Sequence, residues 1–157
     1  MLKTSKMRAF TLVELMVTLA VLAVIIGIAV PNMSTFIKKQ AVRSTADEMV
    51  LSLVYARSEA LKSNSDIYVL PSPDGWASGW RVCRVCEDGG CSELLRSFTP
   101  SGKSLLFTGF GAQIKLNHKG MRAAGGEEFT IADPALPDSE KRCIKLHKTG
   151  RAAITSC

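Results

Sequence analysis

Aromatic residues and histidine are scarce in this chain of 157 residues. Phe, Trp and Tyr together make up 6% of the sequence, and the two histidines are His118 and His147. The sequence also lacks a glycine-rich phosphate loop, a Gly-x-Ser-x-Gly nucleophile elbow and a closely spaced pair of metal-binding histidines. A catalytic centre built on several imidazoles is therefore excluded, and we expect a protein that is not an enzyme and has neither cofactor nor metal.

The charge is distributed unevenly along the chain. The formal net charge is +6, and residues 1–9 contain Lys3, Lys6 and Arg8 but no acid. An apolar run follows from Phe10 to Val30. As a helix it would be roughly 32 Å long, enough to cross the core of a bilayer. The cations before it predict that the N-terminus stays in the cytoplasm.

A secretory signal that is later removed would begin in the same way. Two properties of the run argue against that alternative. The run is long for a signal core, and it contains Glu14. Because a carboxylate in hydrocarbon is costly, such a residue usually has a partner and a function. We therefore expect a segment that is retained in the working protein.

The residues around the start of the apolar run form a known type of motif. Met7-Arg8-Ala9-Phe10-Thr11-Leu12-Val13-Glu14-Leu15 resembles the class III signal of type IV pilins and type II secretion pseudopilins. In that family a prepilin peptidase cuts before the phenylalanine and methylates the new amino terminus. The resemblance implies a leader over residues 1–9 and a cut between Ala9 and Phe10. Alanine stands here where the family usually has glycine.

The same resemblance gives assembly roles to two residues of the run. It implies that the carboxylate of Glu14 neutralises the amino terminus of Phe10 on an adjacent subunit. Pro31 lies where the family places proline, and its missing amide proton predicts a kink or a loosened turn. The implied partners are other major or minor pilins or pseudopilins, the prepilin peptidase and the inner membrane.

The segment 32–62 is expected to continue the helix with an amphipathic pattern. From Val42 to Leu61, apolar residues recur at intervals of three and four. Tyr55-Ala56-Arg57-Ser58-Glu59-Ala60 looks like the helix end of FimT/FimU minor pilins and of the GspH pseudopilin. With the membrane-spanning first half over 10–31, this predicts one long N-terminal helix.

Residues 63–157 predict a β-rich periplasmic head. After residue 65 the periodicity changes to short apolar runs separated by Pro, Gly, Asp and Ser. No internal repeat is apparent. The expected fold is α+β and pilin-like, with the second half of the long helix packed on an antiparallel sheet. The expected strands are 66–70, 79–86, 92–98, 104–108, 112–118, 128–132, 142–147 and 151–156.

Beyond an export signal, the five cysteines are expected to form disulfides. In a hairpin centred on Gly150, with a loop over 149–151, Cys143 lies opposite Cys157. A cross-strand disulfide is then within reach.

The other cysteines are clustered and leave alternatives open. A hairpin over Glu87–Gly90 would place Cys86 opposite Cys91, which predicts a second disulfide. Cys83 is then either free or paired elsewhere. A zinc knuckle is the alternative for this cluster, although it lacks an obvious fourth ligand.

The C-terminal hairpin is strongly basic. Arg142, Lys145, Lys148 and Arg151 form an electrostatic footprint suited to phosphate. FimT-like proteins of transformable bacteria resemble this hairpin and carry a Gly-Arg-x-Arg motif. Here the sequence is Gly150-Arg151-Ala152-Ala153, so the second arginine is missing. Double-stranded DNA is a candidate partner, and a solvated basic face that keeps the head soluble is the alternative.

These features predict a FimT/FimU-like minor pilin that serves as a low-abundance, initiating or tip subunit in type IV pilus assembly. Two alternatives stay open: a GspH-like pseudopilin of type II secretion, and a minor pilin that captures DNA for natural transformation. The expected location is the inner membrane, with a single pass and a periplasmic head. From there the subunit would enter an extracellular pilus or a periplasmic pseudopilus.

Overall fold

The computed structural model describes residues 10–84, 86–87, 90–102, 104–155 and 157, without the side chains of 28–32 and 86–87. The leader expected over 1–9, including Ala9, lies outside the described residues. The chain divides into two compact units, Met1–Phe36 and Ile37–Cys157. One helix, α1 (Leu12–Ser63), contributes residues to both units, so Pro31 does not end the helix.

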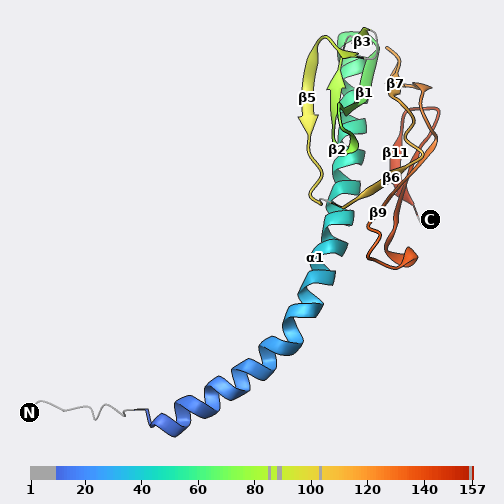
Figure 1. Cartoon of the computed structure of the whole chain (residues 1–157). Coiled ribbons are helices and arrows are strands. Elements are labelled where there is room, and N and C mark those ends of the chain that lie inside the picture. Colours follow the sequence, from blue (N-terminus) through green and yellow to red (C-terminus); the bar gives the residue numbers. More distant parts are fainter. Residues whose placement is uncertain (1–9, 85, 88–89, 103, 156) are drawn as a thin grey trace, which may run out of the picture. The chain divides into compact units, whose positions relative to one another are not determined.

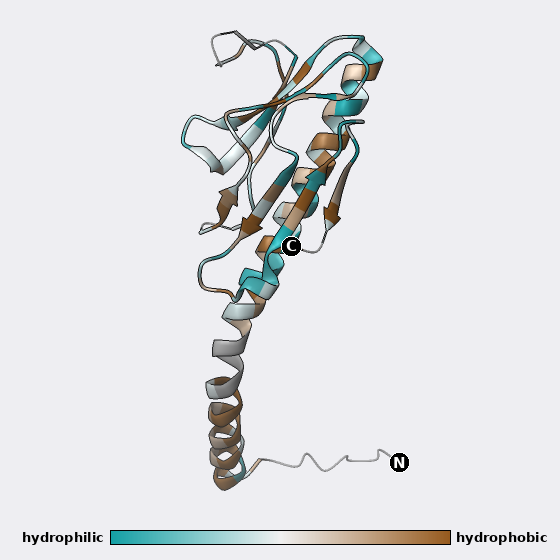
Figure 2. Cartoon of the chain, turned by 90° about the vertical axis from the view of Figure 1, so that its right-hand side faces the viewer, coloured by the Kyte–Doolittle hydropathy of each residue, from teal (hydrophilic) through white to brown (hydrophobic). Residues whose placement is uncertain are grey.

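In the first unit, α1 is largely apolar, as Figure 2 shows. Its large apolar side chains are at least half exposed, from 73% for Leu12 to 50% for Ile26. No helix in the described part of the chain combines the length and the apolarity needed to cross a membrane.

In the second unit, α1 has one buried apolar face. The buried side chains recur every three or four residues, which is the spacing of one helical face. The amphipathic helix predicted from the sequence is thereby confirmed. The helix ends at Ser63, and Asn64 takes a left-handed conformation with φ of 49°. The fully buried positions are Val42, Ala46, Met49, Leu53, Ala56 and Ala60.

Antiparallel strands lie alongside this part of α1 (Figure 1). The first sheet has five strands in the order β5-β2-β1-β7-β8, the second has four in the order β11-β10-β9-β6, and β3 pairs with β4 alone. The expected α+β fold with an antiparallel head is confirmed. The strands are β1 (Ile67–Ser72), β2 (Gly75–Cys83), β3 (Cys86–Glu87), β4 (Gly90–Cys91), β5 (Leu94–Phe98), β6 (Leu106–Thr108), β7 (Ile114–Leu116), β8 (Arg122–Ala124), β9 (Glu128–Ala132), β10 (Arg142–Leu146) and β11 (Ala152–Thr155), and a 3₁₀ helix, η1, covers Asp138–Glu140.

Strand β8 lies outside all the strands that the sequence predicted. It consists of Arg122, Ala123 and Ala124, and two of its residues pair with β7. Alanine is a poor strand former, and three residues show no alternation. The extended conformation of β8 is therefore determined by its pairing with β7 and not by the strand propensity of its residues.

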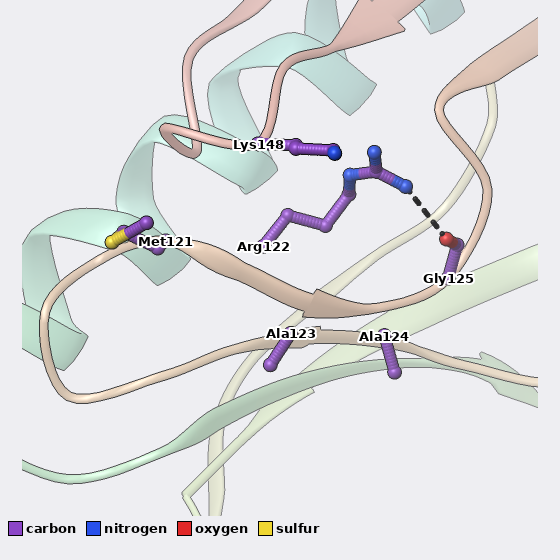
Figure 3. A pocket seen from close by; sticks show the side chains of 6 residues that line it. All are labelled: Met121, Arg122, Ala123, Ala124, Gly125 and Lys148. Atoms are coloured by element: carbon purple, nitrogen blue, oxygen red, sulfur yellow. Dashed lines mark hydrogen bonds between the residues drawn. The ribbon is translucent and has the colours of Figure 1, made fainter.

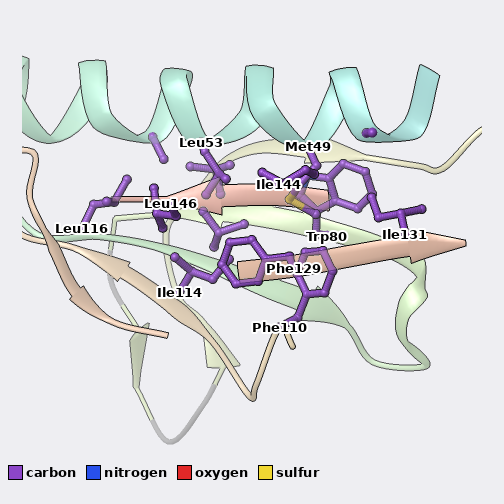
Figure 4. Packing of buried hydrophobic residues seen from close by; sticks show 14 of the residues in the cluster. Met49, Leu53, Trp80, Phe110, Ile114, Leu116, Phe129, Ile131, Ile144 and Leu146 are labelled. Atoms are coloured by element: carbon purple, nitrogen blue, oxygen red, sulfur yellow. The ribbon is translucent and has the colours of Figure 1, made fainter. Parts of the chain in front are cut away.

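The hydrophobic core lies between α1 and the strands (Figure 4). Aromatic rings fill its centre, and Phe110 stacks on Phe129 with ring centroids 4.6 Å apart. Ile144 and Leu146 of β10 are completely buried in the same cluster. All residues of the described core belong to the second unit, so this unit contains its own hydrophobic core.

Candidate functional site

The C-terminal hairpin, β10 and β11, has a three-residue turn. The amide of His147 donates to the carbonyl of Arg151 at 2.9 Å, and the amide of Gly150 donates to the carbonyl of His147 at 2.8 Å. Gly150 occupies the last position of the turn with φ of +75°, a left-handed value that favours glycine. The turn therefore covers 148–150 instead of the predicted 149–151.

This placement shifts the register of the hairpin by two residues from the prediction. Cys143 pairs with Thr155 and lies diagonal to Cys157, where the sequence placed Cys157 directly opposite. The predicted disulfide between Cys143 and Cys157 is nevertheless formed, with Cα atoms 5.2 Å apart. A diagonal neighbour on the same face of the pair is still within reach of a disulfide.

The second disulfide joins Cys83 to Cys91, and the predicted pair of Cys86 and Cys91 is wrong. Cys86 does lie opposite Cys91 in the β3–β4 ladder, so the predicted hairpin itself is confirmed. The register of β2 is irregular between Val82 and Cys83. Such an irregularity changes the local direction of a strand, and Cys83 ends with its Cα 5.7 Å from that of Cys91. Two cysteines of the zinc-knuckle alternative are thus bonded to each other.

A cluster of charges connects this region to α1. The guanidinium of Arg84 contacts Glu93 and also binds Glu59 of α1 at 3.1 Å. The amide of Arg84 donates to the carbonyl of Glu93 at 3.0 Å. The β2–β5 end of the first sheet is thereby attached to the helix by an ion pair.

A second turn, between β7 and β8, repeats the geometry of the C-terminal turn. The amide of Asn117 donates to the carbonyl of Met121 at 2.9 Å, and the amide of Gly120 donates to Asn117 at 2.7 Å. The sequences His118-Lys119-Gly120-Met121-Arg122-Ala123-Ala124 and His147-Lys148-Thr149-Gly150-Arg151-Ala152-Ala153 are also similar, although the turn geometry aligns Gly120 with Gly150 and offsets the other shared residues by one. Sequence reasoning missed this repeat because the glycine is displaced by one residue between the two copies.

The two turns are in direct contact. The amide of Arg122 donates to the carbonyl of Lys148 at 3.0 Å. Gly150 lies so close to the other turn that a Cβ on it would be 1.9 Å from the carbonyl oxygen of Gly120. A Cβ on Gly120 would be 3.0 Å from Cγ of Arg57. Both turns therefore pack on each other and on α1, and we call them the paired turns.

The cations proposed from sequence to bind DNA differ in their surroundings. Lys145 lies 3.9 Å from Glu127, and Arg142 is half-buried. Lys148 and Arg151 are exposed, and neither forms an ion pair with any residue that the structure describes. The structure therefore brings Lys148 and Arg151 together on the paired turns and leaves the other two cations at the adjoining strand.

Two carboxylates elsewhere on the head, Glu140 and Asp66, are held by lysines. Lys39 hydrogen-bonds Glu140 at 2.9 Å and holds the pKa of that carboxyl below its ordinary value. Lys115 lies 2.7 Å from Asp66, whose carboxylate also accepts the amide of His118 at 3.1 Å. The hydrogen bond from Lys115 lowers the pKa of Asp66. Both acids therefore stay ionised at neutral pH.

A hollow of about 310 Å³ opens beside the paired turns. Figure 3 shows the amine of Lys148 directed toward the guanidinium of Arg122 across it. None of the lining residues is acidic. They are Met121, Arg122, Ala123, Ala124, Gly125 and Lys148.

At the other end of the chain, Glu14 lies in the first turn of α1 and is exposed. Its amide donates to the hydroxyl of Thr11 at 3.2 Å, which makes Thr11 the N-cap of the helix. A carboxylate three residues after such a cap is favoured by the helix dipole. The position of Glu14 thus has a local reason that is independent of any partner.

Comparisons with known proteins agree with this architecture. The family described as type II transport protein GspH matches residues 45–150, and the prokaryotic N-terminal methylation motif matches residues 4–30. No curated protein matches the chain by sequence.

Solved structures of two bacterial proteins share the fold. The type IV minor pilin FimU of Pseudomonas aeruginosa has 22% identity and a TM-score of 0.65, covering 76% of this chain and 92% of that chain. The minor pseudopilin EpsH from the type 2 secretion system of Vibrio cholerae has 14% identity and a TM-score of 0.55, covering 73% and 96%. Since the GspH match covers most of the chain, this protein belongs to the GspH family, among the type IV minor pilins and pseudopilins.

Proposed function

We propose that this protein is a non-catalytic minor subunit of a type IV pilus, incorporated through its N-terminal helix. The observation that carries the proposal is the exposed apolar surface of α1 in the first unit. Large apolar side chains there are at least half exposed, and surface of that extent normally contacts a partner. Helices of other pilins or pseudopilins offer a matching apolar surface, and the inner membrane holds the subunit before assembly.

Glu14 would supply specificity within this otherwise apolar contact. After a prepilin peptidase cuts between Ala9 and Phe10, the new amino terminus of one subunit needs a negative partner in the filament core. The carboxylate of Glu14 on a neighbour fits, because an unpaired charge in such a core is costly. An alternative assignment is a GspH-like pseudopilin of type II secretion, which would use the same contact in a periplasmic filament.

Replacing Glu14 with glutamine tests this role. Glutamine preserves the helix cap but removes the charge, so we expect normal amounts in the membrane fraction. The amount of the subunit in sheared filaments should fall by about tenfold or more. An uncompensated buried charge costs more free energy than a tenfold change in an equilibrium constant requires. Immunoblotting of both fractions measures the effect.

The matched control is Asp47→Ala, which removes an exposed carboxylate from the second-unit part of α1. It should leave incorporation unchanged. Equal incorporation of the Glu14→Gln variant and the wild type would refute the role of Glu14. Deleting the gene and comparing surface pili with secreted enzymes decides between the pilus and the secretion assignment.

A second candidate function is capture of double-stranded DNA for natural transformation. The observation that favours it is the exposure of Lys148 and Arg151 on the paired turns, without ion pairs in the described part of the chain. Lys119 on the other turn is also exposed. Cations in this arrangement can contact successive phosphates without reading sequence.

Fluorescence anisotropy with a labelled duplex tests this second function. At low salt the full chain should bind with a Kd on the order of micromolar or weaker. Arg151→Gln should weaken binding equally for every sequence and reduce the salt slope by about one unit. Lys141→Gln is the control, because Lys141 is already paired with Asp138 at 2.9 Å. Absence of binding at low ionic strength would exclude the paired turns as a DNA site.

A further inference from the structure

Two cations, Lys148 and Arg122, line the hollow beside the paired turns, and no acid is among its lining residues. Lys148 comes from the β10–β11 turn and Arg122 from the start of β8, and Figure 3 shows the amine of Lys148 directed toward the guanidinium of Arg122. The backbone bond from Arg122 to Lys148, 3.0 Å long, fixes this approach. Since like charges repel, the arrangement favours an anion that lies between them.

The guanidinium of Arg122 has one hydrogen-bond donor without an acceptor among the described residues. One terminal nitrogen donates to the carbonyl of Gly125 at 3.0 Å, and the other lies 3.5 Å from the carboxylate of Glu127. Its Nε is shielded from solvent and has no acceptor among the described residues. Lys148 cannot satisfy it, because an ammonium group has only donors. An oxyanion would provide acceptors for both side chains.

We propose that this hollow binds a single phosphate group, held by Nζ of Lys148 and the guanidinium of Arg122. Two positive charges match a phosphate monoester or inorganic phosphate, and arginine and lysine are both established binders of phosphate oxygens. The small side chains of Ala123 and Ala124 leave the hollow open. The site does not depend on filament assembly or on DNA capture, because all its groups belong to the folded head.

Competition between phosphate and an acetylating reagent tests the site on the full chain in detergent. Lys148 and Lys119 are both exposed and lie on matching turns, so Lys119 is an internal control. Inorganic phosphate should slow acetylation of Lys148 relative to chloride at the same ionic strength. At a concentration of about twice the Kd the slowing should be about threefold, because the protected fraction follows mass action. Mass spectrometry of the peptides measures both rates.

Two variants change the protection in opposite directions. Arg122→Gln should abolish it. Glu127→Gln should increase it, because the carboxylate that now competes for Arg122 is removed; Glu127 is exposed, so this variant retains the fold. If phosphate slows Lys148 and Lys119 equally, or slows neither, the proposal is wrong. It is equally wrong if Glu127→Gln reduces the protection.

A short DNA duplex distinguishes the sources of the phosphate group. Protection of Lys148 by inorganic phosphate but not by the duplex supports a site for free phosphate or a monoester. Protection by both, with Lys119 also slowed by the duplex, supports a site that accepts the phosphodiester backbone as well. Protection by the duplex alone would overturn the proposal, since the hollow must hold an isolated phosphate group.

Discussion

Replacing Gly150 with alanine is expected to lower the free energy of unfolding of the head by about 4 kcal/mol or more. The added methyl group would lie 1.9 Å from the carbonyl oxygen of Gly120, which is far inside contact distance. A backbone carbonyl cannot change rotamer as a side chain can, so the backbone of one of the paired turns must move. The positive φ of Gly150 adds about 1–2 kcal/mol for any residue with a Cβ.

Chemical denaturation of the fragment 37–157 measures this effect, because that unit contains the whole described core. Gly111→Ala is a matched control. Gly111 has φ of +63°, but a Cβ on it would meet nothing within 4 Å. This variant should lose only about 1 kcal/mol, from the backbone conformation alone. Similar losses in Gly111→Ala and Gly150→Ala would mean that the contact with Gly120 is unimportant.

Breaking the disulfide between Cys143 and Cys157 should have the next largest effect. We expect Cys157→Ser to lower the free energy of unfolding by about 3 kcal/mol, the chain-entropy value for a closed loop of this size. Cys157 is exposed, so serine there buries no new polar group. The buried Cys143 remains as a thiol among its present neighbours.

Denaturation under oxidising and reducing conditions provides the control for this variant. Oxidised wild type and oxidised Cys157→Ser should differ, whereas the fully reduced proteins should unfold at the same denaturant concentration. A difference that persists after reduction would show that Cys157 acts through contacts other than its disulfide. No difference under oxidising conditions would contradict the expected stabilisation.

The long helix could be predicted from the sequence because one physical pattern determines it. Apolar residues such as Val42, Met49 and Leu53 recur with the helical period, and those positions are buried. The locations of most strands could also be predicted, since turn residues separate short apolar runs. Strand β8 was missed, because its arginine and alanines carry no strand signal and pairing with β7 determines its conformation.

The candidate site could be predicted from the sequence less completely than the fold. The basic hairpin and its disulfide could be predicted, but the turn that contains Gly150 was misplaced by one residue. That glycine is required at the last turn position and for contact with Gly120, which only the tertiary structure reveals. Likewise, the pairing of Cys83 with Cys91 depends on an irregularity in β2, and Arg122 gains significance only through its approach to Lys148.

Strand β10 places a requirement on the length of chain that must be synthesised before the head is stable. Ile144 and Leu146 are completely buried in the cluster that includes Met49 and Leu53 of α1. A ribosome makes α1 first and β10 much later, so a polypeptide that stops before Leu146 leaves the apolar face of its helix uncovered. Exposed apolar surface of this kind attracts proteases and chaperones. Truncated translation products would therefore be removed before they could compete with intact subunits.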